Sequence, residues 1–255
     1  MHALISILSL FICLNALAAA DYDREKKWAD EILPSVLTGD PVYLEQADGH
    51  KFLSLYTQAD KAMTAVILVH GRGASAEDIL GFSGPLAQPG VAFLAPQAAD
   101  HTWYPQRFLA PLAVNEPWLS SALAKLASLR ATVVATGIPD ERIVWLGFSQ
   151  GACLASEFVA RNPRRWGGLV AAVGGRIGPP GMELSDAGDL ARTPVYLGCG
   201  DDDPHIPWSR VAESAAAFER QNAEVTLRRY PGFPHAVHPE AVSFARRLLD
   251  GFAAS

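Results

Sequence analysis

Six short runs of apolar residues, separated by longer amphipathic stretches, constrain the fold of this chain more than any other feature. The runs cover residues 64–69, 91–95, 142–146, 168–173, 194–197 and 224–228. Strands that are apolar along their whole length are buried on both faces, which is typical of a parallel sheet between two layers of helices. The stretches between them carry helical periodicity or helix boundary signals, from Ser75 onward and over residues 118–136, 151–161, 209–221 and 239–252. We therefore predict an α/β fold with a mostly parallel central sheet and helices on both faces.

The part of the chain before residue 64 follows a different pattern. Residues 28–37 have the pattern of a short helix, and the strand-like runs 41–45 and 51–56 flank Asp48 and Gly49, a dipeptide favoured in hairpin turns. We expect an antiparallel strand pair at this end of the sheet. The 255 residues, 49% of them hydrophobic, fit a single domain over residues 21–255. The insert 97–117 and the loop 174–192 are both too short for a separate cap domain.

The first twenty residues have the layout of a cleavable signal peptide. An apolar stretch from Ala3 to Leu14 precedes small residues at Ala16, Ala18, Ala19 and Ala20, and the charged run 21–27 follows. Only Met1 and His2 come before the apolar stretch, so the usual leading Lys or Arg is missing. We expect a periplasmic or secreted protein whose mature chain is not stably inserted in a membrane. There are two alternatives. The segment is an uncleaved anchor, or the start of the chain is mis-assigned and the protein is cytoplasmic.

Charge and cysteine content exclude several classes of function. The net charge is −6 and the acidic and basic residues are interspersed, with no cationic run that could neutralise a phosphate backbone, so nucleic acid is not an expected partner. After the leader only Cys153 and Cys199 remain, too few for a disulfide framework and without metal-ligand spacing. We interpret both as buried core thiols, and whether they bridge depends on their separation in space.

Residues 142–146 lead directly into Gly147-Phe148-Ser149-Gln150-Gly151 and then into a predicted helix. This is the context of a nucleophile elbow, in which a sharp turn raises a serine hydroxyl above the edge of the sheet. Glycine is needed on both sides because the strained turn brings neighbouring backbone close. A Gly-x-Ser-x-Gly pattern also occurs at ordinary turns with a capping serine, and the flanking strand and helix favour Ser149 as a nucleophile.

A serine nucleophile needs a general base and a group that orients this base. The run 194–197 leads into Asp201, Asp202 and Asp203, and the run 224–228 leads into His235, so an acid and then a histidine follow Ser149 at carboxyl ends of strands. We choose Asp203 as the acid, while its two neighbours have the pattern of a solvated turn. His235, after a Gly-Phe-Pro turn, is preferred to His238, which we expect at the surface where the last helix begins.

Two further groups of residues are predicted around Ser149. Residues 64–69 end at His70-Gly71-Arg72-Gly73, and the backbone N–H groups of Arg72 and Gln150 are predicted to form an oxyanion hole, with His70 structural. The Arg72 side chain is expected either to contact acidic groups near the mouth of the site or to be solvated. Within the insert, Trp103, Tyr104, Phe108 and Leu109 are predicted to line an acyl groove. The alternative is that these four only pack the insert onto the core.

The motifs together resemble the phospholipase/carboxylesterase family of α/β hydrolases, which includes carboxylesterases, lysophospholipases and acyl-protein thioesterases. The similarity runs from about residue 65 to the C-terminus. It rests on the motifs His70-Gly-Arg-Gly, Ala95-Pro-Gln, Thr102-Trp-Tyr-Pro, Gly147-Phe-Ser-Gln-Gly, Asp203-Pro-His-Ile-Pro and Pro231-Gly-Phe-Pro-His. The resemblance implies an α/β-hydrolase fold without a cap domain, a Ser149-Asp203-His235 triad and no cofactor. Cys199 and Pro234 depart from the family pattern, and so does the leader, because relatives of this type are mostly cytoplasmic.

We therefore expect a carboxylesterase-type serine hydrolase that works through an acyl-enzyme on short to medium acyl esters, without a metal. A lysophospholipase and an acyl thioesterase are the alternatives among enzymes. A non-catalytic binding protein with a hydrolase fold is the alternative from another class. The expected partner is a small-molecule ester, and a homodimer is left open.

Overall fold

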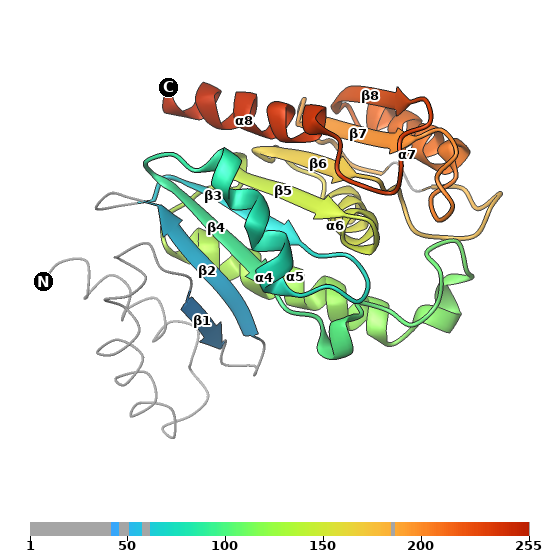
Figure 1. Ribbon diagram of the computed structural model, residues 1–255, viewed down its shortest axis with the longest axis horizontal. Coiled ribbons are helices and arrows are strands. Elements are labelled where there is room, and N and C mark those ends of the chain that lie inside the picture. Colours follow the sequence, from blue (N-terminus) through green and yellow to red (C-terminus); the bar gives the residue numbers. More distant parts are fainter. Residues whose placement is uncertain (1–41, 46–50, 58–61, 185–186, 255) are drawn as a thin grey trace, which may run out of the picture.

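The computed structural model describes residues 42–45, 51–57, 62–184 and 187–254. In this part of the chain eight strands form one sheet in the order β1-β2-β4-β3-β5-β6-β7-β8 (Figure 1). β2 is antiparallel to both β1 and β4, and the other neighbouring strands are parallel. The strands are β1 Val42–Glu45, β2 Lys51–Thr57, β3 Thr64–Val69, β4 Val91–Pro96, β5 Ile143–Phe148, β6 Gly168–Ala172, β7 Pro194–Gly200 and β8 Glu224–Tyr230. This arrangement confirms the predicted mostly parallel sheet with an antiparallel pair at its N-terminal end.

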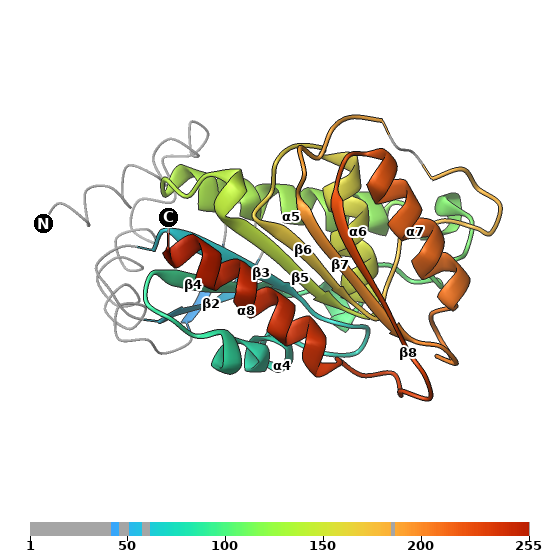
Figure 2. The same cartoon turned by 90° about the horizontal axis from the view of Figure 1, so that it is seen from above.

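Helices cover both faces of the sheet, as predicted (Figure 2). α5 (Trp118–Ala135), α6 (Gln150–Arg161) and α7 (Trp208–Arg220) pack in one apolar cluster with one side of the strands. α4 (Ala76–Leu80) and α8 (Pro239–Ala253) pack in a second cluster on the other side. The fold is that of an α/β hydrolase, with short connections and the insert 97–117 in place of a cap domain.

β5 lies between β3 and β6 near the middle of the sheet and carries the core on both of its faces. Ile143 and Trp145 belong to the first cluster, whereas Val144 and Leu146 belong to the second. Trp145 is fully buried, and its ring centroid lies 4.6 Å from that of Phe158 in α6. Because β5 is held from both sides, the turn that follows it starts from a rigid strand.

β8 differs from the prediction that its run is apolar and buried. Its side chains are exposed or half-buried, and they include Glu224, Arg228 and Arg229. β8 forms the edge of the sheet and pairs with β7 alone. Charged side chains on an edge strand disfavour pairing with another chain, which explains the composition of this strand.

The boundaries of several elements extend beyond the predicted ones, as two examples show. α6 starts at Gln150, one residue before the predicted start, and β7 continues through Gly198, Cys199 and Gly200. The predicted leader 1–20, the predicted helix 28–37 and the turn at Asp48 and Gly49 lie outside the described residues. Among the helices of the described part, none has the length and apolar character needed to span a membrane.

Candidate active site

Ser149 occupies a sharp turn between the end of β5 and the start of α6. Its backbone has φ 54° and ψ −118°, a strained combination for a residue with a side chain. Both flanking glycines are required sterically. A Cβ at Gly147 would lie 2.4 Å from the carbonyl oxygen of Gly151, and a Cβ at Gly151 would lie 2.1 Å from that of Val69. The elbow expected from the sequence is therefore present, with Ser149 at its tip.

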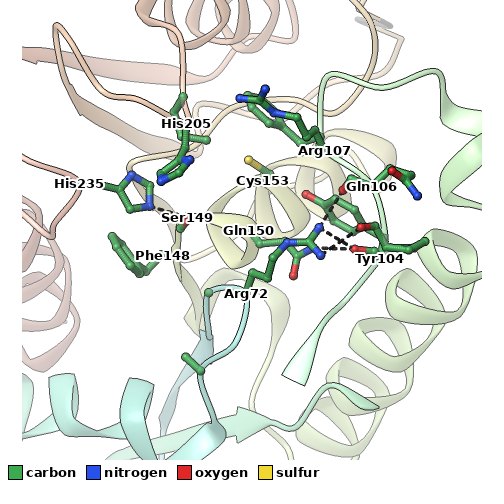
Figure 3. A pocket seen from close by; sticks show the side chains of 15 residues that line it. Arg72, Tyr104, Gln106, Arg107, Phe148, Ser149, Gln150, Cys153, His205 and His235 are labelled. Carbon is green, nitrogen blue, oxygen red and sulfur yellow. Dashed lines mark hydrogen bonds between the residues drawn. The ribbon is translucent and has the colours of Figure 1, made fainter. Parts of the chain in front are cut away.

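The structure brings Ser149, His235 and Asp203 together in one hydrogen-bonded row. Nε2 of His235 lies 2.8 Å from Oγ of Ser149, and Nδ1 of His235 lies 2.7 Å from Oδ2 of Asp203. Figure 3 shows His235 reaching toward Ser149 from the adjacent loop. An ionised Asp203 can only accept from Nδ1–H, which leaves Nε2 of a neutral imidazole free to accept the serine proton.

Asp203 has a more enclosed environment than the two aspartates before it. Its carboxylate is fully buried, and Oδ1 accepts hydrogen bonds of 2.9 Å from the backbone N–H groups of His205 and Ile206. Burial disfavours the charged form, but these two bonds and the bond to His235 outweigh it and hold the pKa of Asp203 below its ordinary value. Asp202 is exposed, and Asp201 accepts from the backbone N–H of Gly232. The geometry thus places Asp203 against His235.

His238 lies where the prediction put it, half-buried at the N-cap of α8. Its ring accepts from the backbone N–H of Glu240 and stacks on Tyr230, with ring centroids 3.6 Å apart. These contacts hold the start of α8 rather than the site. His70 is likewise structural: Nδ1 donates to the Gly71 carbonyl and Nε2 accepts from the backbone N–H of Ala98, and burial lowers its pKa, so that the ring stays neutral.

Arg72 and Gln150, whose backbone N–H groups were predicted to form the oxyanion hole, both line the pocket that contains Ser149. Among the described residues, neither N–H donates a hydrogen bond to another protein group. Gln150 is also the first residue of α6, so its N–H belongs to the positive end of that helix. The Gln150 side chain accepts from the backbone N–H of Trp103 and donates to the Tyr104 carbonyl, which fixes the residue next to the nucleophile. Both N–H groups are therefore available to donate hydrogen bonds to an oxyanion.

The Arg72 side chain is exposed, in line with one of the two expectations, and its contacts to other described residues are to backbone carbonyls and not to acidic groups. Its guanidinium group donates to three consecutive backbone carbonyls, those of Tyr104, Pro105 and Gln106, at 2.9, 3.1 and 2.8 Å (Figure 3). Arg72 thereby ties the turn after β3 to the insert. Sequence patterns do not predict such bonds, because they depend on where the insert returns to the site.

A pocket of about 460 Å³ opens at Ser149 and His235. Of the four residues predicted to form an acyl groove, Tyr104 and Phe108 line this pocket, together with the apolar side chains of Phe148 and Ile206. Trp103 and Leu109 are not among the lining residues. Trp103 is buried beside His70, and its Nε1 donates to the His70 carbonyl, while Leu109 packs against the core. For these two residues the structure instead fits the alternative, packing of the insert.

Several lining residues were not singled out from the sequence. Arg107 and His205 are exposed side chains on the pocket wall, and the ring of His205 lies 4.9 Å from that of His235, edge-on. Arg107 and His205 could have been identified by their closeness in sequence to predicted site residues. Arg107 directly precedes Phe108, and His205 follows Asp203 by two residues.

Cys153, one turn into α6, lies in the floor of the pocket. Burial raises its pKa to about 12, which keeps the thiol protonated. Cys199 is also buried, and both thiols are free, as expected for core cysteines. The residues that the structure describes include no cluster of three or more His, Cys, Asp or Glu that could hold a metal ion.

Comparison with known proteins gives consistent matches. The profile of the phospholipase/carboxylesterase family matches residues 51–251. Acyl-protein thioesterase 1 of Saccharomyces cerevisiae is 32% identical over 135 residues, which cover 49% of this chain and 59% of that protein. Acyl-protein thioesterase 1 of Eremothecium gossypii is 29% identical over 214 residues, 79% of this chain and 83% of that protein.

Solved structures resemble the chain over a longer part of its length. A phospholipase/carboxylesterase from Dyadobacter fermentans superimposes with a TM-score of 0.73 at 39% identity, covering 83% of this chain and 99% of that one. The match to the yeast protein, by contrast, spans less than two thirds of that relative.

Proposed function

Because the chain belongs to the phospholipase/carboxylesterase family of α/β hydrolases, we propose that it hydrolyses carboxylic esters with Ser149 as nucleophile, His235 as general base and Asp203 as the orienting acid. One observation carries this proposal. The contacts of 2.8 Å from His235 to Ser149 and 2.7 Å from His235 to Asp203 place a general base at the serine hydroxyl and an orienting carboxylate behind that base.

In the acylation step, His235 takes the proton of the Ser149 hydroxyl while Oγ attacks the carbonyl carbon of the ester. The tetrahedral intermediate carries its negative charge on the former carbonyl oxygen, which the N–H groups of Arg72 and Gln150 stabilise. His235 then returns the proton to the departing alcohol, and the acyl group remains on Ser149. Asp203 holds the imidazole in the required tautomer and stabilises its protonated form.

Deacylation repeats these steps with water. His235 takes a proton from water, the resulting hydroxide attacks the acyl carbonyl, and the proton goes to Oγ of Ser149 as the acid product leaves. All proton transfers run through Nε2, because Nδ1 stays bonded to Asp203. The cycle consumes one water and needs neither a metal nor an organic cofactor.

The pocket supports short to medium acyl chains as substrates. Its volume of about 460 Å³ is in the lower half of the usual range for small-molecule sites, and its wall is formed partly by Tyr104, Phe108 and Phe148. Thioester hydrolysis is the second candidate, favoured by the relatives named acyl-protein thioesterases. Lysophospholipids are a third substrate class within the same mechanism. Export of the chain remains a proposal that rests on residues 1–20 alone.

Replacing Ser149 with alanine tests the mechanism, because Ala keeps the strained backbone and removes only the hydroxyl. We expect p-nitrophenyl butyrate turnover to fall by roughly 10⁵-fold or more, with an unchanged circular dichroism spectrum. A fluorophosphonate probe should label the wild type and leave the variant unlabelled. Ser243→Ala, on the exposed face of α8, makes the same chemical change away from the site and should behave as the wild type. Unchanged turnover in Ser149→Ala would refute the mechanism, and a wild type inert to both ester and probe would support a non-catalytic binding protein.

A further inference from the structure

The wall of the pocket formed by residues 104–108 is held by hydrogen bonds to every one of its backbone carbonyls. The Arg72 guanidinium group donates hydrogen bonds to the carbonyls of residues 104, 105 and 106. The buried Asn115 side chain accepts from the N–H of residue 106 and donates to the carbonyl of residue 107. The carbonyl of residue 108 accepts from Gly178 at 2.8 Å. A loop with its peptide groups fixed in this way presents its side chains in a reproducible position.

Arg107 lies in the middle of this held segment, and its side chain is not used by the fold. The residue is exposed and lines the pocket, and among the described residues its guanidinium group makes no ion pair or hydrogen bond. Other arginines of the chain are engaged in ion pairs, as Arg176 is with Glu157 and Arg210 with Glu213. A rigid backbone therefore holds, at the pocket that contains Ser149, a cation that has no partner within the described part of the chain.

The charge of the pocket differs from that of the chain. Of the residues that the structure describes, two arginines and two histidines line it and no aspartate or glutamate does, although the chain as a whole carries a net charge of −6. Asp203 faces His235 and two backbone N–H groups, so its carboxylate does not compensate Arg107. Figure 3 shows Arg107, His205 and His235 around the same opening. A cationic pocket in an acidic protein attracts anions selectively.

We propose that this pocket selects esters that carry a carboxylate or another oxyanion, and that Arg107 is the residue that binds this anion. The inference rests on the proposed ester hydrolysis and names its substrate class. A guanidinium group binds a carboxylate through two parallel N–H···O bonds, a geometry that lysine does not reproduce. His205 contributes a further N–H donor at the rim. The anion is bound in the ground state and in the transition state alike, so Arg107 acts mainly on KM.

Two matched substrate pairs distinguish the side of the ester on which the anion lies. Monomethyl adipate against methyl hexanoate places a carboxylate on the acyl chain. The acetate ester of 6-hydroxyhexanoic acid against hexyl acetate places it on the alcohol. A pH-stat measures the acid released from all four. We expect the wild type to give a higher kcat/KM for the anionic member of at least one pair, and the preference to shrink as ionic strength rises.

Arg107→Gln should lower the anionic-to-neutral ratio of kcat/KM about tenfold, mainly through KM, as expected for loss of a charge-assisted hydrogen bond at a partly exposed site. Arg107→Lys should give an intermediate ratio, because lysine restores the positive charge but cannot form the two parallel hydrogen bonds of a guanidinium group. Arg246→Gln removes the same charge from the exposed face of α8, where the side chain donates to the Pro85 carbonyl, and should leave the ratio at its wild-type value.

The outcomes separate this inference from the proposed mechanism. If neutral esters are hydrolysed in a Ser149-dependent way and the ratio in both pairs is the same for wild type and Arg107→Gln, Arg107 is a solvated arginine and the inference is overturned. If the wild type hydrolyses none of the four esters, or Ser149→Ala retains turnover, the proposed mechanism itself fails and the inference falls with it. Thermal unfolding of each variant checks that the fold is retained.

Discussion

Replacing Glu157 with methionine is expected to lower the free energy of unfolding by about 5 kcal/mol. Glu157 lies in α6 and is buried, with 3% of its side chain exposed. It pairs at 2.8 Å with Arg176, whose side chain is also 3% exposed, and accepts the backbone N–H of Ile177 at 3.1 Å. Methionine has a similar length and keeps the helix, so the change removes the acceptor and little else.

The magnitude follows from what the substitution leaves behind. Removing one partner of a buried ion pair costs roughly 3–5 kcal/mol, because the remaining charge stays desolvated and has lost its counter-charge. The Ile177 N–H, also left without its acceptor, adds about 1 kcal/mol at the lower end of the penalty for such groups. The second salt bridge of Glu157, to Arg161, contributes little because Arg161 is 39% exposed.

Equilibrium unfolding in urea measures the effect, since Trp145 and Trp166 are fully buried and report loss of the core by fluorescence. A double-mutant cycle with Arg176→Met isolates the pair. In Glu157→Met/Arg176→Met both charges are gone, so we expect the double variant to be more stable than either single variant and within about 2 kcal/mol of the wild type.

The pH dependence gives an independent check. Burial opposes ionisation of Glu157, but Arg176 and then Arg161 outweigh it and hold the pKa of this carboxyl below its ordinary value. The stability gained from a lowered pKa is complete above the unfolded-state value, about 4.3, and is lost as the pH falls through the folded-state value. The stability difference between wild type and Glu157→Met should therefore narrow below about pH 4. A loss under 1 kcal/mol at pH 7, or a double variant as unstable as the sum of the single ones, would refute the reasoning.

Two further predictions concern the site. Asp203→Asn should lower kcat by roughly 10³–10⁴-fold, because an amide no longer fixes the His235 tautomer. Asp202→Asn, at the exposed neighbouring position, should keep the wild-type kcat. An equal kcat in both variants would exclude Asp203 as the orienting acid. Gly151→Ala should abolish soluble expression or lower the melting temperature by more than 10 °C, since its Cβ would lie 2.1 Å from a backbone oxygen. Gly251→Ala, in α8 with no atom within 4 Å of the added Cβ, should be neutral or stabilising, and a stable Gly151→Ala would contradict the steric argument.

Much of the site could be predicted because its constraints are local. A buried strand, a strained turn between two glycines and a helix start are all encoded within residues 142–161. Asp203 and His235 are distant in sequence, but each follows a parallel strand, and the carboxyl ends of parallel strands meet at one edge of the sheet. The positions of Ser149, Asp203 and His235 after parallel strands therefore predicted that the three residues lie close together, without knowledge of any side-chain contact.

Side-chain directions in the insert could not be predicted in the same way. Trp103 and Tyr104 are adjacent and both aromatic, yet the first packs under His70 and the second lines the pocket. No repeating dihedral pattern assigns faces in an irregular segment. Here the directions follow from bonds to Arg72 and Gln150, more than 30 residues away.

The sequence by itself determined the class of fold, the elbow and the chain order of serine, acid and histidine, because apolar periodicity and glycine sterics act over a few residues. Only the tertiary structure decided that β8 is an exposed edge, that Arg72 holds the insert, that Glu157 meets Arg176, and that Arg107 lines the pocket without a partner among the residues described. The physical reason is the same in each case. Burial and pairing of a polar side chain depend on which distant segment packs against it, and a single sequence carries no local signal of that contact.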